Sequence, residues 1–466
     1  MSTYKINNLN SIYISAAHKS SGKTIISIGL SRIFSNLNIN IRTYKKGPDY
    51  IDMGWLSAAS RNNCYNLDFN TQTKDEIVDL YNKKNLDFNI IEGNKGLYDG
   101  LDVLGADDNS AMSILLHTPV ILVINAQGIT RGIAPLIQGY INFEKKCKIK
   151  GVILNKVSTE RHESKLIQAV ENYTDLKIFG SIRKNDDLII SERHIGLMPA
   201  NEKKIANKKI NSIAKIIESS VDKNVFSKLG IKFKKINNTL KRKDSPVYIK
   251  SNKNIKLGIF YDSSFGFYYS DDIENFIKYG ADIIYIDAIK DNKLPLVDAL
   301  FIGGGFPEIN ARKLEKNKNL IKEIKKFIEE GNPCYAECGG LIYLSEYIYH
   351  KNKKFKMVGV IPGYIDMCKN PVGRGYVKLN INKSHPWKIK NKKLLHAHEF
   401  HHANLIFNKA KKCEYAYDVK RGYGSDGKND GYIYKNLLAN FSHLRHTKNY
   451  PWIKYFMNFV EEKKND

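Results

Sequence analysis

A cysteine stands between an acidic residue and two glycines in the segment PCYAECGGLIYL, residues 333–344. The apolar residues before Cys338 favour a strand and those after it favour a helix, so the pattern predicts a sharp turn that presents the thiol. A helix N-terminus favours a thiolate through its dipole and its free N–H groups. We therefore predict that Cys338 is a nucleophile and that Cys334, within the strand, is buried and inert. A core cysteine is the alternative at 338, but it does not account for the two glycines.

Two other segments could complete a site around this thiol. Gly303, Gly304 and Gly305 end a predicted strand, and free backbone amides in such a turn, together with that of Gly339, stabilise an oxyanion. The segment ANFSHLRH near the C-terminus carries His443, which could take the thiol proton. A lone histidine is more often structural, but its combination with a thiol and a glycine turn favours nucleophilic catalysis.

A second kind of chemistry is indicated near the N-terminus. Residues 17–24, AHKSSGKT, nearly satisfy the phosphate-binding pattern G-x-x-x-x-G-K-[ST], with alanine in place of the first glycine. They fall between a predicted strand, SIYIS, and a predicted helix, TIISIGLSRIFSNL, as the motif requires. Ser-Gly-Lys before a helix without any phosphate role is the alternative. We predict an ATP site in which backbone amides hold phosphate, lysine supplies a cation and threonine binds Mg²⁺, formed by Ser21, Gly22, Lys23 and Thr24.

Carboxylates follow two further predicted strands. Asp49 comes after INIRTYK and Glu92 ends FNIIE, and ligands gather at the carboxyl ends of strands in open α/β sheets. We predict that Asp49 and Glu92 hold Mg²⁺ together with Thr24, the alternative being that they cap turns. For three more acidic residues a role in binding substrate and a role in capping turns stay equally open: Asp52, Asp68 and Asp99.

The elements that must position these residues alternate between β-branched runs and amphipathic stretches. Such alternation predicts an α/β fold, with a mostly parallel sheet in the N-terminal half and a second α/β unit after a Lys- and Asn-rich stretch. We predict four parts: a P-loop domain at 9–206, a linker at 207–254, a second α/β domain at 255–450 and a C-terminal tail at 451–466.

Composition excludes several function classes. Lys and Arg number 74 against 48 Asp and Glu, a net charge of +26, but the lysines are spread among asparagines and no nucleic-acid-binding motif accompanies them. The six cysteines have no disulfide or zinc spacing, which indicates a reducing compartment. No targeting segment or membrane-length apolar run is evident. We expect a cytoplasmic protein that binds neither nucleic acid nor membrane.

The motifs together resemble one family. HKSSGKT, YKKGPDYID, IEGNKGLYDG, GGGFPE, YAECGGLIYL, HEFHHA and SHLRH occur in the order found in the cobyrinic acid a,c-diamide synthase family, which includes relatives that amidate other tetrapyrroles. The resemblance covers nearly the whole chain. It implies a P-loop amidoligase domain similar to dethiobiotin synthetase, joined to a class I glutamine amidotransferase domain. It also implies a ligase that amidates the a and c acetate carboxylates of a tetrapyrrole, using glutamine and ATP.

The resemblance also implies roles for single residues. Cys338 matches the glutaminase nucleophile and His443 the histidine that activates it, while Lys23 belongs to the ATP site. The segment HEFHHA would line the site or a domain interface, which makes His398 and His401 candidate substrate-binding residues. The implied cofactors are ATP and Mg²⁺. The implied partners are L-glutamine and a polycarboxylate tetrapyrrole, with a homodimer as the candidate assembly.

The chain departs from the pattern of that family in places. Arg445 stands where many class I glutaminases carry the glutamate of a triad, although this family generally lacks that residue. Differences at 370–377, at Asn125 and at 69–70 leave siroheme or sirohydrochlorin as alternative substrates. A P-loop regulatory ATPase with a degenerate glutaminase domain is the alternative from another class, and a cysteine hydrolase with an idle P-loop is a further one.

Overall fold

The computed structural model describes residues 10–190, 192–193, 196–197, 203–222, 254–389, 394–407 and 413–465. The chain divides into two compact units. The first contains the described residues up to Glu192 and those from 203 to 222, and the second contains Arg193, Gly196–Leu197 and the described residues from Asn254 onward. None of the helices in the described part of the chain is both long enough and apolar enough to cross a membrane.

The first unit is built on a seven-stranded parallel sheet with the order β3-β2-β4-β1-β5-β6-β7. Its central strands are buried on both faces, which explains why they are rich in Val and Ile throughout. The strands predicted at SIYIS, INIRTYK and FNIIE are confirmed as the first, second and fourth strands along the chain. The strands are β1 Ser11–Ala16, β2 Ile41–Lys46, β3 Cys64–Leu67, β4 Phe88–Glu92, β5 Val120–Asn125, β6 Ile149–Val157 and β7 Lys177–Arg183.

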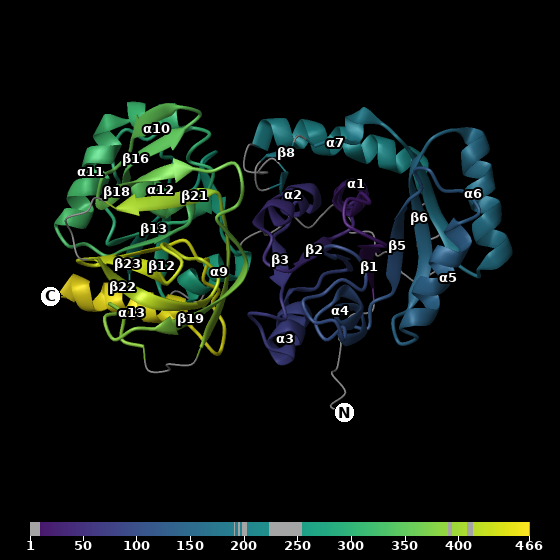
Figure 1. Ribbon diagram of the computed structural model, residues 1–466, viewed down its shortest axis with the longest axis horizontal. Coiled ribbons are helices and arrows are strands. Elements are labelled where there is room, and N and C mark those ends of the chain that lie inside the picture. The colour runs from purple at the N-terminus through teal and green to yellow at the C-terminus, as the bar shows by residue number, and fades with distance from the viewer. Residues whose placement is uncertain are drawn as a thin grey trace. The chain divides into compact units, whose positions relative to one another are not determined.

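Helices connect these strands and cover the sheet. Figure 1 shows α5 and α6 beside β6, and α7 running above α1 and α2. A short pair, β8 (Glu192–Arg193) with β9 (Gly196–Leu197), forms a separate two-stranded sheet. The helices of the first unit are α1 Lys23–Asn36, α2 Tyr50–Ser60, α3 Lys74–Lys84, α4 Asn109–Leu115, α5 Ile133–Phe143, α6 Glu160–Tyr173, the 3₁₀ turn η1 Asp186–Leu188 and α7 Lys203–Ser220.

Helix α7 corrects the predicted linker at 207–254. Ile210, Ile213 and Ile217 recur at helical spacing and are fully buried. A Cβ on Gly29 of α1 would lie 2.5 Å from Ile217, so the two helices approach closely because Gly29 has no side chain. The Lys- and Asn-rich composition hid this apolar stripe. The rest of the predicted linker, 223–253, lies outside the described residues.

The second unit has a nine-stranded mixed sheet with the order β12-β10-β13-β15-β24-β23-β22-β19-β20, of which the first five strands are parallel. A four-stranded sheet, β17-β16-β18-β21, and the pair β11-β14 complete its β-structure among the described residues. The strands are β10 Ile255–Phe260, β11 Phe265–Phe267, β12 Ala281–Ile286, β13 Ala299–Ile302, β14 Gly304–Gly305, β15 Cys334–Glu337, β16 Ser345–His350, β17 Lys353–Lys356, β18 Ile361–Met367, β19 Gly373–Ile381, β20 Leu395–His401, β21 Ala403–Phe407, β22 Glu414–Arg421, β23 Asn429–Tyr434 and β24 Leu437–Asn440.

Helices of the second unit differ from the expectation at one point. The helix predicted after Cys338 ends at Leu344, and Ser345–His350 forms strand β16, because its Tyr and Ile residues pair with β17 and β18. The helices are α9 Ser270–Lys278, α10 Ala311–Lys316, α11 Lys318–Glu329, α12 Gly339–Leu344 and α13 Trp452–Asn465.

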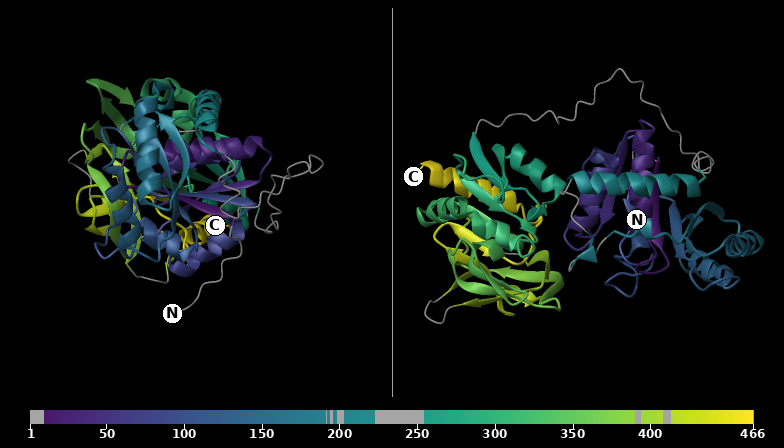
Figure 2. Two further views of the ribbon diagram at one scale, coloured as in Figure 1. Left: turned by 90° about the vertical axis from the view of Figure 1, so that its right-hand side faces the viewer. Right: turned by 90° about the horizontal axis from the view of Figure 1, so that it is seen from above.

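Helix α13 corrects the predicted C-terminal tail at 451–466. Trp452, Phe456 and Val460 lie four residues apart on one face and are fully buried. The Trp452 ring packs edge-on against Phe276 of α9, with ring centroids 5.4 Å apart. The helix, yellow in Figure 2, is therefore part of the core of the second unit.

Candidate active sites

Cys338 sits at a strained turn between β15 and α12. Its backbone has φ 46° and ψ −100°, in the region that residues with a Cβ rarely adopt, and it is the N-cap of α12. Its N–H donates to the carbonyl of Asn440, with N and O 2.7 Å apart, which ties the turn to β24. Its Sγ lies 3.8 Å from the carbonyl oxygen of Phe400. The predicted elbow is therefore confirmed, and Cys334 is fully buried in the strand, where burial raises the pKa of its thiol.

His443 comes to this thiol because β24 pairs in parallel with β15. Glu337 and Asn440 are partners in that pairing, so the chain beyond each strand meets at the same edge of the sheet. Burial lowers the pKa of His443, but side-chain hydrogen bonds with Cys338 and Glu337 raise it more, to about 10. A buried histidine held as a cation beside a sulfur stabilises the thiolate.

Glu337, which the sequence analysis gave no role, lies on the other side of His443. Its Oε2 is 3.4 Å from Nδ1 of His443, and both side chains are 3% exposed. In a regular strand Glu337 and Cys338 would point to opposite faces of the sheet, since side chains alternate. The left-handed backbone at 338 breaks the alternation, so adjacent residues reach the same imidazole.

The glycine turn approaches the same histidine. A Cβ on Gly304 would lie 2.5 Å from Cε1 of His443, and one on Gly339 would lie 2.8 Å from the nitrogen of Gly305. These positions need glycine because the imidazole and the neighbouring backbone occupy the space. The amide of Gly303 is already engaged, since it donates to Oη of Tyr268 at 2.9 Å. Gly304 and Gly305 remain the predicted oxyanion donors from this turn.

The HEFHH segment divides into different environments. His398 stacks on His443 with ring centroids 4.8 Å apart, and its Nδ1 is 3.3 Å from Oη of Tyr269. His401 stacks on Phe441 at 4.0 Å and is 1% exposed. His398 therefore belongs to the surroundings of the thiol, whereas His401 packs in the interior. Substrate binding by either one stays a prediction.

Arg445 and His446, which follow His443 closely in the chain, have other partners. His446 accepts a hydrogen bond at Nδ1 from the N–H of Ile453 and packs against Tyr279. Burial lowers the pKa of His446 to about 4. Arg445 pairs with Asp271 at 2.8 Å. A guanidinium has no acceptor atom, so Arg445 cannot take the place of a carboxylate beside an imidazole N–H.

The P-loop of the first unit forms a turn between β1 and α1. Gly22 is the N-cap of α1 with φ 100°, and a Cβ there would lie 2.1 Å from Nδ2 of Asn155. Asn155, at the carboxyl end of β6, donates from Nδ2 to the carbonyl of Ser21. Glycine is therefore required at 22 by both its backbone and its neighbour. The turn leaves the N-terminus of α1 open to a phosphate, as the motif predicts.

Four of the predicted residues converge beside this turn. Thr24 donates to Oε1 of Glu92 at 2.7 Å, and its Oγ1 lies 3.4 Å from Oδ2 of Asp52. Lys23 donates to the carbonyl of Lys95 at 2.5 Å. Burial first, and the charge of Lys45 second, lower the pKa of Lys23 to about 8. The structure thus brings the P-loop cation, a hydroxyl and two carboxylates into one cluster.

Lys45 joins this cluster, and the sequence analysis missed it. Its Nζ lies 2.5 Å from Oδ2 of Asp52 and 2.8 Å from Oε1 of Glu92. Burial alone would lower the pKa of Lys45, but the two carboxylates outweigh burial and raise it well above the usual value. The pairing of β2 with β4 sets Lys45 directly opposite Glu92, a neighbour that cannot be identified without knowing the strand order.

The remaining predicted carboxylates serve turns in this structure. Asp49 caps α2 by accepting the N–H of Asp52 at 2.8 Å, and burial first, then the charge of Asp52, raise the pKa of Asp49 to about 7. Asp68 accepts from Oγ1 of Thr71, and Asp99 accepts from the N–H of Gly96. Asp52 therefore lies in the cluster beside Thr24, whereas Asp49 is linked to the cluster through its hydrogen bond with the N–H of Asp52.

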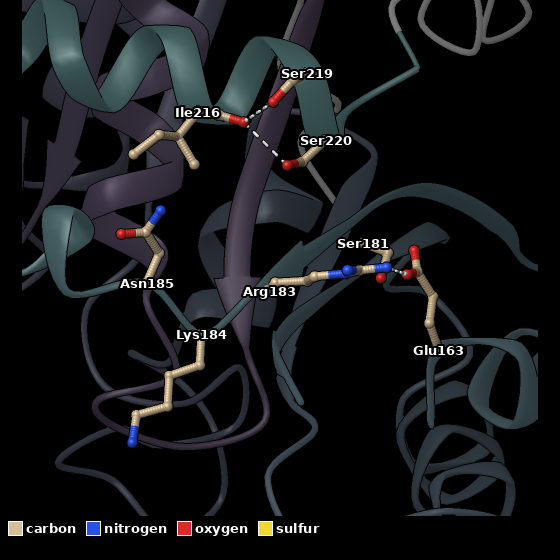
Figure 3. Close-up of a pocket in the computed structure, with 8 residues that line it drawn as sticks. All are labelled: Glu163, Ser181, Arg183, Lys184, Asn185, Ile216, Ser219 and Ser220. Atoms are coloured by element: carbon tan, nitrogen blue, oxygen red, sulfur yellow. Dashed lines mark hydrogen bonds and ion pairs between the residues drawn. The ribbon is translucent and has the colours of Figure 1, made fainter. Parts of the chain in front are cut away.

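A separate pocket of about 570 Å³ lies at the carboxyl end of β7. Arg183 and Lys184 line it from β7 and the residue that follows, and Ser219 and Ser220 line it from the end of α7, as Figure 3 shows. Its Arg183 pairs with Glu163 at 3.5 Å. None of the predicted site residues lines this pocket.

Comparison with known proteins places both units in families. Residues 13–197 match the CobQ/CobB/MinD/ParA nucleotide binding domain, and residues 256–451 match the CobB/CobQ-like glutamine amidotransferase domain. Three curated relatives carry the name cobyrinate a,c-diamide synthase. The protein of Magnetococcus marinus is 34% identical over 97% of this chain and 97% of its own. That of Archaeoglobus fulgidus is 34% identical over 97% and 98%, and that of Picrophilus torridus 38% identical over 94% and 95%.

These matches extend over both units and nearly the full length of the relatives. They confirm the resemblance inferred from the motifs and the two α/β folds that it implied. The chain belongs to the cobyrinate a,c-diamide synthase family, with its nucleotide-binding domain followed by a glutamine amidotransferase domain.

Proposed function

We propose that this chain is an ATP-dependent ligase that converts carboxylates of a tetrapyrrole to amides, with glutamine as the nitrogen donor. The observation that carries the proposal is the convergence of Cys338, His443 and the glycine turn at the β15 elbow, on the same chain as a P-loop. A thiol site alone would support a hydrolase, and a P-loop alone would support an ATPase. Their occurrence together gives each a purpose, since one releases ammonia and the other activates its acceptor.

In the glutaminase reaction, Cys338 attacks the carboxamide carbon of glutamine. The proton of this thiol is held by His443, whose pKa is raised to about 10, and the amides of Gly304 and Gly305 stabilise the negative oxygen that develops. When the tetrahedral intermediate collapses, His443 returns the proton to the leaving nitrogen, so ammonia departs and a thioester forms. Water then attacks the thioester, releases glutamate and restores the thiol. Each proton that is transferred in this series of steps is carried by His443 or by water.

In the ligase reaction, ATP transfers its γ-phosphoryl group to an acetate carboxylate of the macrocycle, giving an acyl phosphate and ADP. Ammonia attacks the acyl carbon and phosphate leaves, so the product is an amide. Lys23 supplies a positive charge for the transferring phosphoryl group, and the N-terminus of α1 supplies N–H groups for phosphate oxygens. Ammonia is mostly protonated at neutral pH, so we expect a sheltered path between the two reactions.

The cluster at Thr24 has the chemistry that Mg²⁺ requires. Its donors are a hydroxyl and carboxylate oxygens, the ligands that this hard cation prefers. Oε2 of Glu92 is buried and has no hydrogen-bond partner among the described residues. No group of three His, Cys, Asp or Glu side chains in the described chain forms a metal site by itself. We propose that Thr24, Asp52 and Glu92 hold Mg²⁺ together with ATP, with Asp49 as the fourth candidate. When bound, the ion neutralises charge on the phosphates.

For the substrate we propose the a and c acetate side chains of a cobyrinic acid type of tetrapyrrole, because the relatives carry that substrate in their names. The net charge of +26 suits a macrocycle fringed with carboxylates. The test is turnover with glutamine and ATP-Mg²⁺ on cobyrinic acid, sirohydrochlorin and siroheme side by side, followed by product mass. Two added amides on cobyrinic acid support the proposal. Amidation of only siroheme or sirohydrochlorin overturns the substrate but keeps the chemistry.

A matched variant separates this proposal from a regulatory ATPase. Lys23→Ala should remove amide formation with either glutamine or ammonium as nitrogen source, because the charge beside the phosphoryl group is lost. Lys156, which donates to the carbonyl of Ser20 from the surface, is the control, and Lys156→Ala should keep most of the activity. ATP hydrolysis without any amide product, on all three substrates, would count against a ligase. The homodimer stays a prediction that light scattering can test.

A further inference from the structure

Glu337 is a buried carboxylate beside the catalytic imidazole, and the proposed reaction does not yet use it. Its Oε2 is 3.4 Å from Nδ1 of His443. It directly precedes the nucleophile, so the carboxylate and the thiol reach one ring from two adjacent positions of the chain. A carboxylate that contacts one nitrogen of a buried histidine selects the tautomer and the orientation of the ring.

The other oxygen of Glu337 is fixed by two donors. Oη of Tyr335 donates to Oε1 at 2.5 Å, and the N–H of Leu444, the residue after His443, donates to the same atom at 2.8 Å. Nδ2 of Asn440 lies 3.3 Å from Oη of Tyr335, which extends the network to β24. Because Oε1 is occupied in this way, Oε2 is the oxygen that faces the imidazole.

The groups that face His443 leave Glu337 as the acceptor for its Nδ1–H. The ring of His398 stacks flat on that of His443, an arrangement that directs no acceptor at a ring nitrogen. The side chain of Cys338 is the acid that needs a base. Arg445, at the position where many class I glutaminases carry an acid, pairs with Asp271 on α9. Two further charged groups interact with these residues. Arg445 acts electrostatically on His398, and the carboxylates of Glu337 and Asp272 act electrostatically on each other.

We propose that Glu337 is the positioning residue of the glutaminase, so that Glu337, His443 and Cys338 form a triad in which the acid comes from the position before the nucleophile. This inference rests on the proposed glutaminase activity. The carboxylate of Glu337 is the acceptor for the Nδ1–H of His443. This leaves Nε2 to hold the proton that comes from the thiol. With that proton on Nε2, the carboxylate stabilises the imidazolium until Nε2 passes the proton to departing ammonia.

The test is Glu337→Gln, which keeps the shape of the side chain but removes its charge and offers an amide donor to Nδ1. Glutaminase kcat should fall by about 10²- to 10⁴-fold, since the ring then presents the wrong tautomer. The KM for glutamine should change little, because Glu337 does not touch the substrate. Amidation with ammonium as the nitrogen source should match the wild-type rate, which shows that the variant is folded.

The pH profile gives a readout that a structural role would not move. Glu337 helps to raise the pKa of His443. Without the carboxylate, His443 loses its proton at lower pH, so the alkaline limb of the glutaminase profile should shift down by about one pH unit or more. Glu337→Asp, which restores the charge, should recover part of the turnover and part of the shift. Glu337→Asp also keeps the test decisive if Glu337→Gln does not fold.

A second buried glutamate is the matched control. Glu399 is 1% exposed and lies 3.7 Å from Nε2 of His401, but neither residue contacts the thiol. Glu399→Gln should keep its pH profile unshifted. Equal losses of glutaminase turnover in Glu337→Gln and Glu399→Gln would overturn the triad. Wild-type turnover in Glu337→Gln, with an unshifted alkaline limb of the pH profile, would also overturn it. If the wild-type protein releases no glutamate from glutamine, the proposed function fails instead, so the two failures are distinct.

Discussion

The two units hold their charged groups in different ways. In the second unit the thiol, the imidazole and the carboxylate contact one another in the order that proton transfer needs. In the first unit the Lys45 ammonium lies on the carboxylates of Asp52 and Glu92, so the charges satisfy each other. The glutaminase site is therefore preorganised, whereas we infer that the ATP site exchanges its internal ion pairs for nucleotide contacts.

The largest effect should come from Cys338→Ala. Glutamine-dependent amidation should be abolished, because no other described residue presents a nucleophile to that site. Amidation with a high concentration of ammonium salt should continue, since the ATP site makes no use of the thiol. Product mass with each nitrogen source measures both. Equal loss of the two activities in a folded variant would mean that the two sites are not separable.

His443→Ala tests the preorganised site more finely. Turnover of glutamine should fall by about 10²- to 10⁴-fold, because proton transfer to and from the thiol is lost. Accumulation of the thioester during a single turnover is the measurement. His446→Ala, whose imidazole faces Ile453 and Tyr279 instead, is the control and should have a milder effect. The assignment of the base would be refuted by normal thioester formation in His443→Ala and its loss in His446→Ala.

Lys45→Met tests the ion-paired site. Removing the cation leaves two buried carboxylates without their counter-charge, so the free energy of unfolding of the first unit should fall by about 3–5 kcal/mol. Arg183→Ala removes the half-exposed partner of Glu163 and should cost less than about 1 kcal/mol. Denaturant titration, followed by a probe in the first unit, compares the two. A cost for Lys45→Met as small as that for Arg183→Ala would refute the contrast between the units.

The smallest effect concerns pH. The pKa of Lys23 is lowered to about 8, so in the free protein its charge is present below pH 8 and is lost above it. Binding of ATP then requires uptake of a proton, and affinity should fall by up to about tenfold per pH unit above 8. In Lys23→Arg the charge persists, so affinity should stay level. Calorimetry at pH 7 and pH 9 distinguishes the variants, and equal slopes would rule out titration of Lys23.

The sequence predicts best what depends on local order. Strand, turn and helix signals around Gly22 and Cys338 correctly predicted the two turns, because a P-loop and a nucleophile elbow are contiguous segments. The sequence did not indicate a role for Lys45, because Lys45 and Glu92 are neighbours only across the β2–β4 pair. It missed Glu337 for the opposite reason, since alternation along a strand places adjacent side chains on opposite faces until the turn at 338 reverses one of them.

Helices α7 and α13 show a different limit. Their buried residues follow helical spacing, but Lys-rich surroundings gave both segments the composition of a linker or a tail. Composition averages over the whole surface of a helix, whereas burial depends on one stripe. The hydrophobic period, taken alone, would have found Ile210, Ile213 and Ile217.

The position of β24 in its sheet has a consequence for synthesis. This strand, Leu437–Asn440, lies between β15 and β23 in the sheet, yet it follows every other described strand along the chain and leaves the ribosome after them. Domains that are synthesised first fold first, so the nucleotide-binding unit can form early, while the other sheet waits for its centre. His443 emerges later still. On the proposed function, a nascent chain therefore has no working glutaminase until His443 has emerged, after the whole nucleotide-binding unit has been synthesised.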